Sequence, residues 1–346
     1  MDVGWVIEGD IFADVAHCWL LLDRLRIRLR VYSLASEEYS PKPMSEGTPS
    51  TNRLALVYGM AAVGLWSTMA TAFKWALEFS SPMQLITLAA TVSWLFFAAR
   101  LVSRGTLLSF TALSRRSLLR CFSLGFLNPT LFYWVLFSAY DLLPAQDAMA
   151  INYTWGLTLP LIASCFSRSL PSGKEAALAL LSYLGILIIV TDGNLASFEF
   201  ENVTGVLLAI GSTVLWGLSW VINTRTVEHE RMDPEVALLL NFSMAVPILW
   251  AILAATASLP DMNVGTLMGG LYVGLFEMGL AFVLWMNAMQ LTDKPIRVSS
   301  LIFLAPPLSL VFIATVLGEP VATSTLAGLL LILAGLVGQQ ALNRPK

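Results

Sequence analysis

Ten apolar stretches alternate with short polar loops along most of the chain. A helix needs about 20 mainly apolar residues to cross a bilayer, because about 30 Å of hydrocarbon must be spanned with every backbone group bonded internally. The pattern therefore predicts an all-α integral membrane protein with ten transmembrane helices. We place the spans at Leu54–Ala76, Pro82–Val102, Leu118–Tyr140, Gln146–Phe166, Glu175–Thr191, Val203–Asn223, Pro234–Thr256, Val264–Met289, Pro295–Leu317 and Thr323–Leu342.

The positive residues indicate which loops face the cytoplasm. Of the 20 Lys and Arg residues, 19 lie in the two tails or in one alternating set of loops, and Lys74 is the exception. Cytoplasmic loops of membrane proteins carry an excess of Lys and Arg. We therefore expect both termini in the cytoplasm, in a multi-pass protein of the cell (inner or plasma) membrane.

The composition agrees with this class and narrows the function. Hydrophobic residues make up 57% of the chain, charged residues 12%, and the mean hydropathy is +0.73, values far from those of a soluble domain. The three cysteines and two histidines lack the spacing of a disulfide framework or a metal site. No P-loop, G-x-S-x-G or H-E-x-x-H motif is present. We therefore expect no enzyme, no cofactor or metal ion, and no nucleic-acid partner.

The first 53 residues differ from the rest. Apolar residues from Ile11 to Leu29 recur at helical spacing beside Arg24 and Arg28, which suits a cationic helix on the cytoplasmic leaflet. An unattached leader is the alternative. Acidic residues before the apolar run argue against a signal peptide. Residues 33–52 are rich in Ser, Glu, Pro and Thr, so we expect them to be disordered, and translation that starts at Met44 is a further hypothesis.

The membrane region contains an internal repeat. Because Pro82 and Pro234 also open corresponding helices, we assign residues 54–192 and 203–343 to two five-helix repeats. Five is odd, so the second repeat must be inverted relative to the first. Inverted repeats suit alternating access around one site at the midplane. Three landmarks recur 149 or 150 residues apart: Leu65-Trp66 as Leu215-Trp216, Gly125 as Gly274, and Gly185 as Gly335.

Glu277 is the clearest candidate for a functional residue. It lies midway through the eighth predicted span, where a charged side chain costs about 2.5–3.5 kcal/mol on insertion scales. Its counterpart in the first repeat is Asn128, and we expect both side chains to face inward near the midplane. Glu277 would take up a proton on one side and release it on the other, or pair with a substrate ammonium. The alternative is a protonated acid that locks two helices through a hydrogen bond.

Aromatic residues inside the spans extend this candidate site. A buried indole keeps an N–H group that needs a partner, and a central cavity can supply one, although core packing explains each tryptophan alone equally well. Asn152 lies three residues before Trp155 and so on the same helical face. With Glu277 these residues predict an aromatic box with polar handles for a planar or cationic solute. The tryptophans concerned are Trp66, Trp155, Trp216 and Trp285.

Prolines interrupt three predicted spans at a similar depth. Pro129 lies in the third span, Pro160 in the fourth, and Pro306 and Pro307 in the ninth. Each removes an intrahelical hydrogen bond, and freed backbone in a bilayer must be buried in protein or line a wet cavity. We interpret these prolines as candidate hinges or binding elements, with static kinks as the alternative.

Small residues and one lysine complete the pattern. Small side chains every four residues from Gly205 to Gly217, and glycines between Gly328 and Gly338, predict close helix packing or, alternatively, a dimer seam. The sequence leaves the oligomeric state open. Lys74 either snorkels to lipid phosphates or lines an outer exit for an anionic group.

Three motifs carry a family resemblance: Leu65-Trp66-Ser67-Thr68 in the first span, Leu215-Trp216-Gly217 in the sixth, and Pro306 followed by Gly318-Glu319 before the last. With them, residues 54–342 resemble the drug/metabolite transporter superfamily, specifically its ten-helix EamA-like exporters, which implies the same topology. Residues 151–155 are similar to the fourth helix of aromatic amino-acid exporters, which adds Tyr153 to the candidate solute contacts. The first repeat departs from the pattern, because Ser169 stands where a counterpart of Glu319 would lie.

Together these observations predict a secondary transporter. We expect outward movement of a small amphipathic metabolite, such as an amino acid or a related amine, by alternating access with protons as a possible exchange partner. A nucleotide-sugar or drug carrier of the same fold is the alternative within transport. A non-transporting membrane scaffold or sensor is the alternative from another class.

Overall fold

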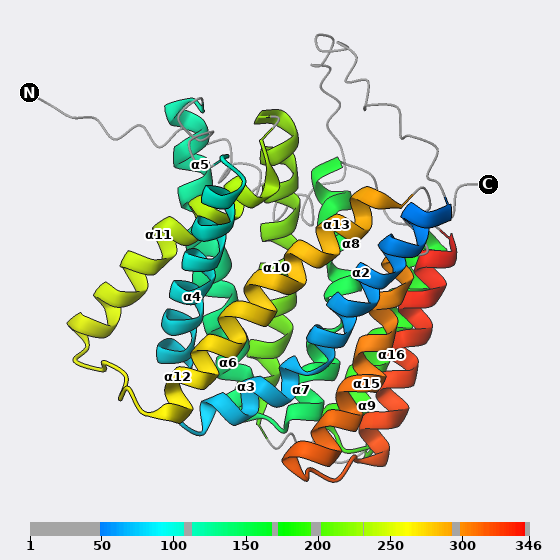
Figure 1. Cartoon of the computed structure of the whole chain (residues 1–346). Coiled ribbons are helices and arrows are strands. Elements are labelled where there is room, and N and C mark those ends of the chain that lie inside the picture. The colour runs from blue at the N-terminus through cyan, green and yellow to red at the C-terminus, as the bar shows by residue number, and fades with distance from the viewer. Residues whose placement is uncertain are drawn as a thin grey trace, which may run out of the picture.

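The computed structural model describes residues 49–106, 113–167, 172–194, 202–230, 232–292 and 298–342. Within these ranges every element of regular secondary structure is a helix, and the helices pack side by side into one bundle (Figure 1). The predicted cationic helix, the segment around Met44, Ser169 and the predicted start of the ninth span at Pro295 lie outside the described residues.

The first half of the bundle contains three interrupted helices, of which the third is split into α7 and α8. One interruption separates α2 from α3, and a π-helical turn, η2, joins α5 to α6. The elements in chain order are α2 (Pro49–Ser67), α3 (Met69–Leu77), α4 (Pro82–Ser103), α5 (Arg115–Gly125), η2 (Phe126–Leu131), α6 (Phe132–Leu142), α7 (Ala145–Asn152), α8 (Trp155–Ser167) and α9 (Gly173–Val190).

The second half repeats the central interruption. A π-helical turn, η3, joins α12 to α13, at the position that corresponds to η2 in the first half. The elements are α10 (Val203–Glu230), α11 (Pro234–Ala255), α12 (Val264–Tyr272), η3 (Val273–Leu280), α13 (Ala281–Leu291), the 3₁₀ turn η4 (Ser300–Leu304), α15 (Ala305–Phe312), η5 (Ile313–Leu317) and α16 (Thr323–Leu342).

Eight helical rods among the described residues are long and apolar enough to cross a membrane. The two other predicted spans are helical as well. One is split into α7 and α8 by a turn at Tyr153–Thr154, and the other is α9. The prediction of a multi-pass, all-helical membrane protein is confirmed, whereas the count of ten crossings stays a prediction.

The second helix of each half starts with the same local chemistry. Ser81 and Gln84 form a capping box at the start of α4, on either side of Pro82. Each side chain is bonded to the other residue's backbone N–H. Asp233 accepts a hydrogen bond from the backbone N–H of Glu235, and Pro234 occupies the first turn. A capping side chain followed by proline favours a helix start, because the proline lacks an N–H that the first turn would leave unpaired.

Corresponding helices of the two halves pack antiparallel. Along α4 and α11, Thr91 bonds to Trp250 and Trp94 bonds to Ser243, so residue numbers rise on one helix as they fall on the other. The pair α9 and α16 behaves alike, because Gly185 packs on Gly328 while the Ser182 hydroxyl donates to the carbonyl of Ile332. Figure 1 shows these last two helices side by side. This antiparallel pairing indicates that helices of the second half run opposite to their counterparts in the first half.

Glycines allow close packing between the third helical rod of each half and the second helix of the other half. The rod α5–η2–α6 packs on α11, and the rod α12–η3–α13 packs on α4. A Cβ on Gly125 would meet the backbone carbonyl of Asn241 in α11, and a Cβ on Gly274 would lie 2.5 Å from the carbonyl oxygen of Ala89 in α4. The two contacts are counterparts under the repeat. Each half therefore completes the packing of the other.

The predicted small-residue stripes are packing surfaces within this chain. A Cβ on Gly205 would meet Leu142 and Leu143, and one on Gly217 would meet Ile162 of α8. The glycines of α16 face α9 in the same way. Small side chains let helix backbones approach closely, so the stripes join helices of one bundle.

Polar contacts differ between the two ends of the bundle. At one end, Arg100 of α4 lies 2.8 Å from Glu235 of α11, and Arg120 of α5 lies 3.7 Å from Glu230 of α10. The described start of α2 and end of α16 lie at this same end (Figure 1). Each ion pair joins one half to the other, and a cytoplasmic position for this end stays a prediction.

Lys74 lies at the opposite end, where its ammonium binds the end of α6. It donates to the carbonyl oxygens of Tyr140 at 2.8 Å and Leu143 at 2.7 Å, and a cation near the last carbonyls stabilises a helix C-terminus. The Glu319 carboxylate accepts from the backbone N–H of Ala145, the first residue of α7, at 3.1 Å. Lys74 and Glu319 thus hold the turn between α6 and α7, a role that neither sequence interpretation of Lys74 included.

Candidate functional site

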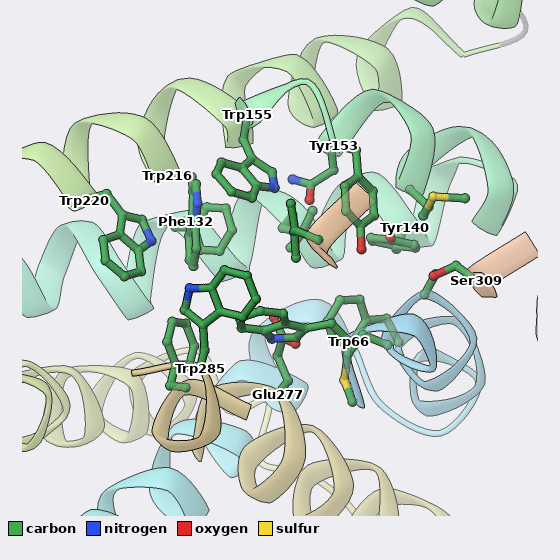
Figure 2. A pocket seen from close by; sticks show the side chains of 18 of the residues that line it. Trp66, Phe132, Tyr140, Tyr153, Trp155, Trp216, Trp220, Glu277, Trp285 and Ser309 are labelled. Atoms are coloured by element: carbon green, nitrogen blue, oxygen red, sulfur yellow. The ribbon is translucent and has the colours of Figure 1, made fainter. Parts of the chain in front are cut away.

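A cavity of about 250 Å³ lies between the two halves. Its walls come from α2 and α3, from the α6–α8 region, and from α10, η3, α13 and α15 (Figure 2). The largest side chains in the wall are aromatic, and the polar groups are few. A mostly apolar cavity with a small number of polar groups is typical of a small-molecule site.

The repeat continues into the wall of this cavity. Five pairs of lining residues are each separated by 150 positions, so each pair takes one member from each half. Corresponding positions of the two halves therefore line the same cavity. The pairs are Trp66 with Trp216, Ala70 with Trp220, Phe132 with Phe282, Asn152 with Ile302, and Leu159 with Ser309.

Seven of the eight side chains predicted to contact a solute line this cavity. Asn128 is the exception, because its amide donates to the Ser219 hydroxyl of α10 at 3.1 Å instead. Its backbone in η2 has non-helical angles, φ −145° and ψ 118°, which changes the direction of the side chain. The seven residues are Trp66, Asn152, Tyr153, Trp155, Trp216, Glu277 and Trp285.

Glu277 projects into the cavity from η3 (Figure 2). The Tyr133 hydroxyl donates to its Oε1 at 3.2 Å, whereas Oε2 is buried and has no hydrogen-bond partner. An unpaired buried oxygen costs free energy that a bound donor would recover. Among the lining residues that the structure describes, Glu277 is the one with a carboxyl group, and none is Lys, Arg or His.

Trp216 is the centre of an aromatic cluster on one wall. Its ring centroid lies 4.7 Å from that of Phe132, 5.7 Å from Trp220, 6.1 Å from Phe282 and 6.2 Å from Trp155. Its indole N–H is buried without a hydrogen-bond partner. The wall therefore offers ring faces and one unused donor.

The opposite wall carries a second aromatic cluster. The ring centroids of Trp66 and Trp285 are 5.3 Å apart, and Trp66 meets Phe282 edge-on at 6.0 Å. Figure 2 places the Glu277 carboxyl beside these rings, across the cavity from Trp155. An amine that binds the carboxylate would therefore lie against aromatic rings.

Two polar residues of the lining, Asn152 and Tyr153, lie where α7 meets α8. The Asn152 amide donates to the Ser212 hydroxyl of α10 at 3.0 Å, which leaves its carbonyl oxygen available as an acceptor. Tyr153 follows at the turn between α7 and α8 and faces the cavity (Figure 2). This turn, and not Pro160, interrupts the rod, since α8 runs unbroken through that proline.

The other candidate hinges lie at changes of helix type. Pro129 is inside η2, and Pro306 and Pro307 occupy the first turn of α15, directly after the 3₁₀ turn η4. Residues in π or 3₁₀ turns often mark functional positions in helices. A hinge role for all four prolines stays a prediction.

Sequence reasoning missed several lining residues, although a signal for most of them was present. Trp220 lies one helical turn after Trp216 and so on the same face. Phe132 and Phe282 are 150 residues apart, so the repeat itself relates them. Tyr140 carried no such signal, because its position depends on how α6 packs, and Ser309 is related by the repeat only to Leu159, which was not predicted.

The sequence pattern of the EamA-like transporter family matches residues 53–191 and 203–338 of this chain. The chain belongs to the EamA-like transporter family. Both matched segments contribute to the cavity, and their boundary falls between α9 and α10. The resemblance to the drug/metabolite transporter superfamily inferred from the motifs is thereby confirmed.

Several proteins with transporter names are similar to this family member. A probable amino-acid metabolite efflux pump of Salmonella typhimurium is 28% identical over 190 residues, 52% of this chain and 61% of that protein, so the chain spans less than two thirds of that relative. The uncharacterized transporter YvbV of Bacillus subtilis is 28% identical over 74% of this chain and 85% of its own length. An uncharacterized transporter of Archaeoglobus fulgidus is 24% identical over 60% of this chain and 70% of its own length.

A solved structure supports the same fold. A crystal structure matches 83% of this chain and 96% of its own chain, with a TM-score of 0.58 and 22% identity. At that identity the likeness concerns the arrangement of the helices alone. The EamA-like fold described here is thus shared with an experimentally determined protein.

Proposed function

We propose that this family member is a secondary transporter that exports a small amphipathic metabolite, such as an amino acid or a related amine, by alternating access. In this proposal ten helices cross the cell membrane as two inverted repeats, with both termini in the cytoplasm. The antiparallel packing of corresponding helices supports the inverted repeats, and the ion pairs at one end of the bundle support the orientation.

The observation that carries the proposal is the cavity between the halves, built from repeat-related residues around one carboxyl group. Two similar halves can exchange conformations and open one central site to either side of the membrane. Glu277 has an oxygen without a partner in that site. A group in this position can bind a proton or a solute cation, one after the other.

Energy for export comes from ion gradients in this proposal, because the sequence contains no nucleotide-binding motif. When Glu277 is ionised, a solute ammonium neutralises it during passage. When the solute leaves, a proton takes its place, so that no bare carboxylate crosses the apolar part of the membrane. One proton then enters for each solute cation that leaves.

The printed name of the Salmonella typhimurium relative supports amino-acid metabolites as the first substrates to test. A nucleotide-sugar carrier would need cationic groups for phosphates, and the described lining residues include no Lys, Arg or His. The aromatic wall leaves an amphipathic drug-like cation as the alternative cargo.

A transport assay in liposomes tests the proposal. Purified full-length protein is reconstituted, a pH gradient is imposed, and accumulation of pooled labelled amino acids and amines is compared with empty liposomes. We expect gradient-dependent accumulation of at least one pool. Liposomes that accumulate no pool above background under any gradient would contradict transport of this substrate class.

The matched variants are Glu277→Gln and Glu175→Gln. Glutamine can still accept the hydrogen bond from Tyr133, but it cannot bind and release a proton, so gradient-driven transport by Glu277→Gln is expected to fall to the level of empty liposomes. Glu175 lies at the exposed start of α9, where glutamine can keep the capping box with Ser172. This control is expected to transport at the wild-type rate.

A further inference from the structure

The charged groups of the lining narrow the class of solute that the cavity can bind. This inference rests on the proposed function and goes beyond it. Among the described lining residues, Glu277 supplies a carboxyl group and no side chain supplies a positive charge. An ionised Glu277 is neutralised by a solute with a single positive charge. A zwitterionic amino acid brings a second carboxylate into the same apolar space, where no cation is present to pair with it.

The hydrogen-bonding groups of the lining lead to the same restriction. The Asn152 amide donates to Ser212, and the Ser309 hydroxyl donates to the backbone carbonyl of Ser67. Among the described lining residues, the fully buried side-chain atoms without a partner are Glu277 Oε2, an acceptor, and the Trp216 indole N–H, a donor. The hydroxyls of Tyr140 and Tyr153 add neutral donors to the lining. A neutral indole donor suits a carbonyl or hydroxyl of the solute, and it does not balance the charge of a carboxylate.

The walls and the volume describe the rest of the solute. Aromatic rings attract cations through their π faces, and the two clusters around Trp216 and Trp66 provide such faces on both sides of the interior. The cavity volume of about 250 Å³ lies just below the range of about 300–1,000 Å³ for drug-sized ligands. A solute with one aromatic ring or one branched chain fits these limits.

We propose that the cavity selects small organic monocations that carry an amine but no carboxylate, such as arylalkylamines and amino-acid amides or esters, over zwitterionic amino acids. The ammonium pairs with Glu277, the apolar body lies between the two aromatic walls, and a neutral acceptor on the solute reaches the Trp216 N–H. One proton leaves Glu277 for each monocation bound, so the occupied and the protonated sites carry the same net charge.

Direct binding to the full-length protein in lipid nanodiscs tests this selection with matched probes. Phenylalanine amide and phenethylamine keep the ring and the amine of phenylalanine without its carboxylate, and phenylpropionate keeps the carboxylate without the amine. We expect the amide and the amine to bind at least about tenfold more tightly than phenylalanine, a difference of about 1.4 kcal/mol. Equal or tighter binding of phenylalanine would overturn the inference.

Two variants link the selection to the carboxyl group. Glu277→Gln removes the charge and is expected to abolish the preference for the amide over phenylalanine. Tyr133→Phe removes the donor to Oε1 but keeps the charge, so it is expected to keep the preference. A Glu277→Gln protein that elutes as the wild type and still prefers the amide would also overturn the inference.

Failure of the inference and failure of the proposed function are distinguishable by transport of the same probes. Liposomes that accumulate phenylalanine as well as its amide would refute the selection while transport itself stands. Absence of both binding and accumulation for every amine and amino acid tested would refute both.

Discussion

The third rod, α5–η2–α6, and the eighth rod, α12–η3–α13 (counted by the ten predicted spans), share one backbone design but carry different polar side chains. Each contains a π-helical turn at its centre, preceded or opened by a glycine that packs on the other half. In the third rod, Asn128 is bound to Ser219 and lies outside the cavity lining. In the eighth rod, Glu277 lines the cavity and keeps one oxygen without a partner.

The two helices therefore share their packing but not their polar chemistry. Symmetric packing of two similar rods allows two related conformations, since interfaces of close-packed helices have discrete alternatives. The chemistry is not duplicated, because a carboxyl group can bind and release a proton and a side-chain amide cannot. In the proposed function, one acid between two similar halves serves as a single exchange site in both conformations.

The strongest test of this comparison exchanges the two side chains. In the double variant Asn128→Glu, Glu277→Asn, the acid moves to position 128, which does not line the cavity. We expect gradient-driven transport to fall to the level of empty liposomes, because the described lining residues then include no carboxyl group to bind and release a proton. Solute accumulation in liposomes measures the effect. Wild-type transport by the exchanged protein would mean that the two positions are equivalent.

The packing glycines test the part of the design that both rods share. Gly125→Ala and Gly274→Ala place a methyl group against a backbone carbonyl of the other half, and such overpacking costs about 1–3 kcal/mol of stability. Thermal unfolding in detergent should show a lower midpoint for both variants. Gly64→Ala is the control, because nothing lies within 4 Å of its added Cβ. A drop in one variant alone would show that the halves pack differently.

The smallest expected effect concerns the partner of Asn128. Ser219→Ala removes the acceptor of the Asn128 amide, which costs about 0.5–1.5 kcal/mol of unfolding free energy. Thermal unfolding measures this loss, and a double-mutant cycle with Asn128→Ala isolates the pair. Because neither side chain lines the cavity, solute binding should stay at the wild-type level. Weaker binding would place Asn128 within the functional site.

Sequence reasoning located the acid and missed the direction of its counterpart. Glu277 is recognisable because a carboxyl in an apolar span is costly, so its presence indicates a function. The symmetric argument placed Asn128 in the same cavity, but the non-helical angles of its backbone direct it to Ser219. A local change of backbone angles leaves no periodic trace in the sequence.

The aromatic residues of the cavity were partly predictable, because a polar N–H group inside an apolar span also stands out in the sequence. Trp66 and Trp216 stand out as indoles inside apolar spans and as repeat counterparts. Tyr140 and Ser309 depend on the packing of α6 and α15 across the interface, which is a tertiary property. The partners of Lys74 were equally hidden, because they are backbone carbonyls at the end of another helix.

The proposed exchange of a proton for a solute cation at Glu277 has a direct measurement. Titration calorimetry of phenethylamine binding in two buffers with different ionisation enthalpies measures the protons released per solute bound, because an alkylamine stays protonated near neutral pH. We expect release by the wild-type protein, up to one proton per solute, and none by Glu277→Gln. Binding without proton release at every pH tested, or equal release by the variant, would contradict it.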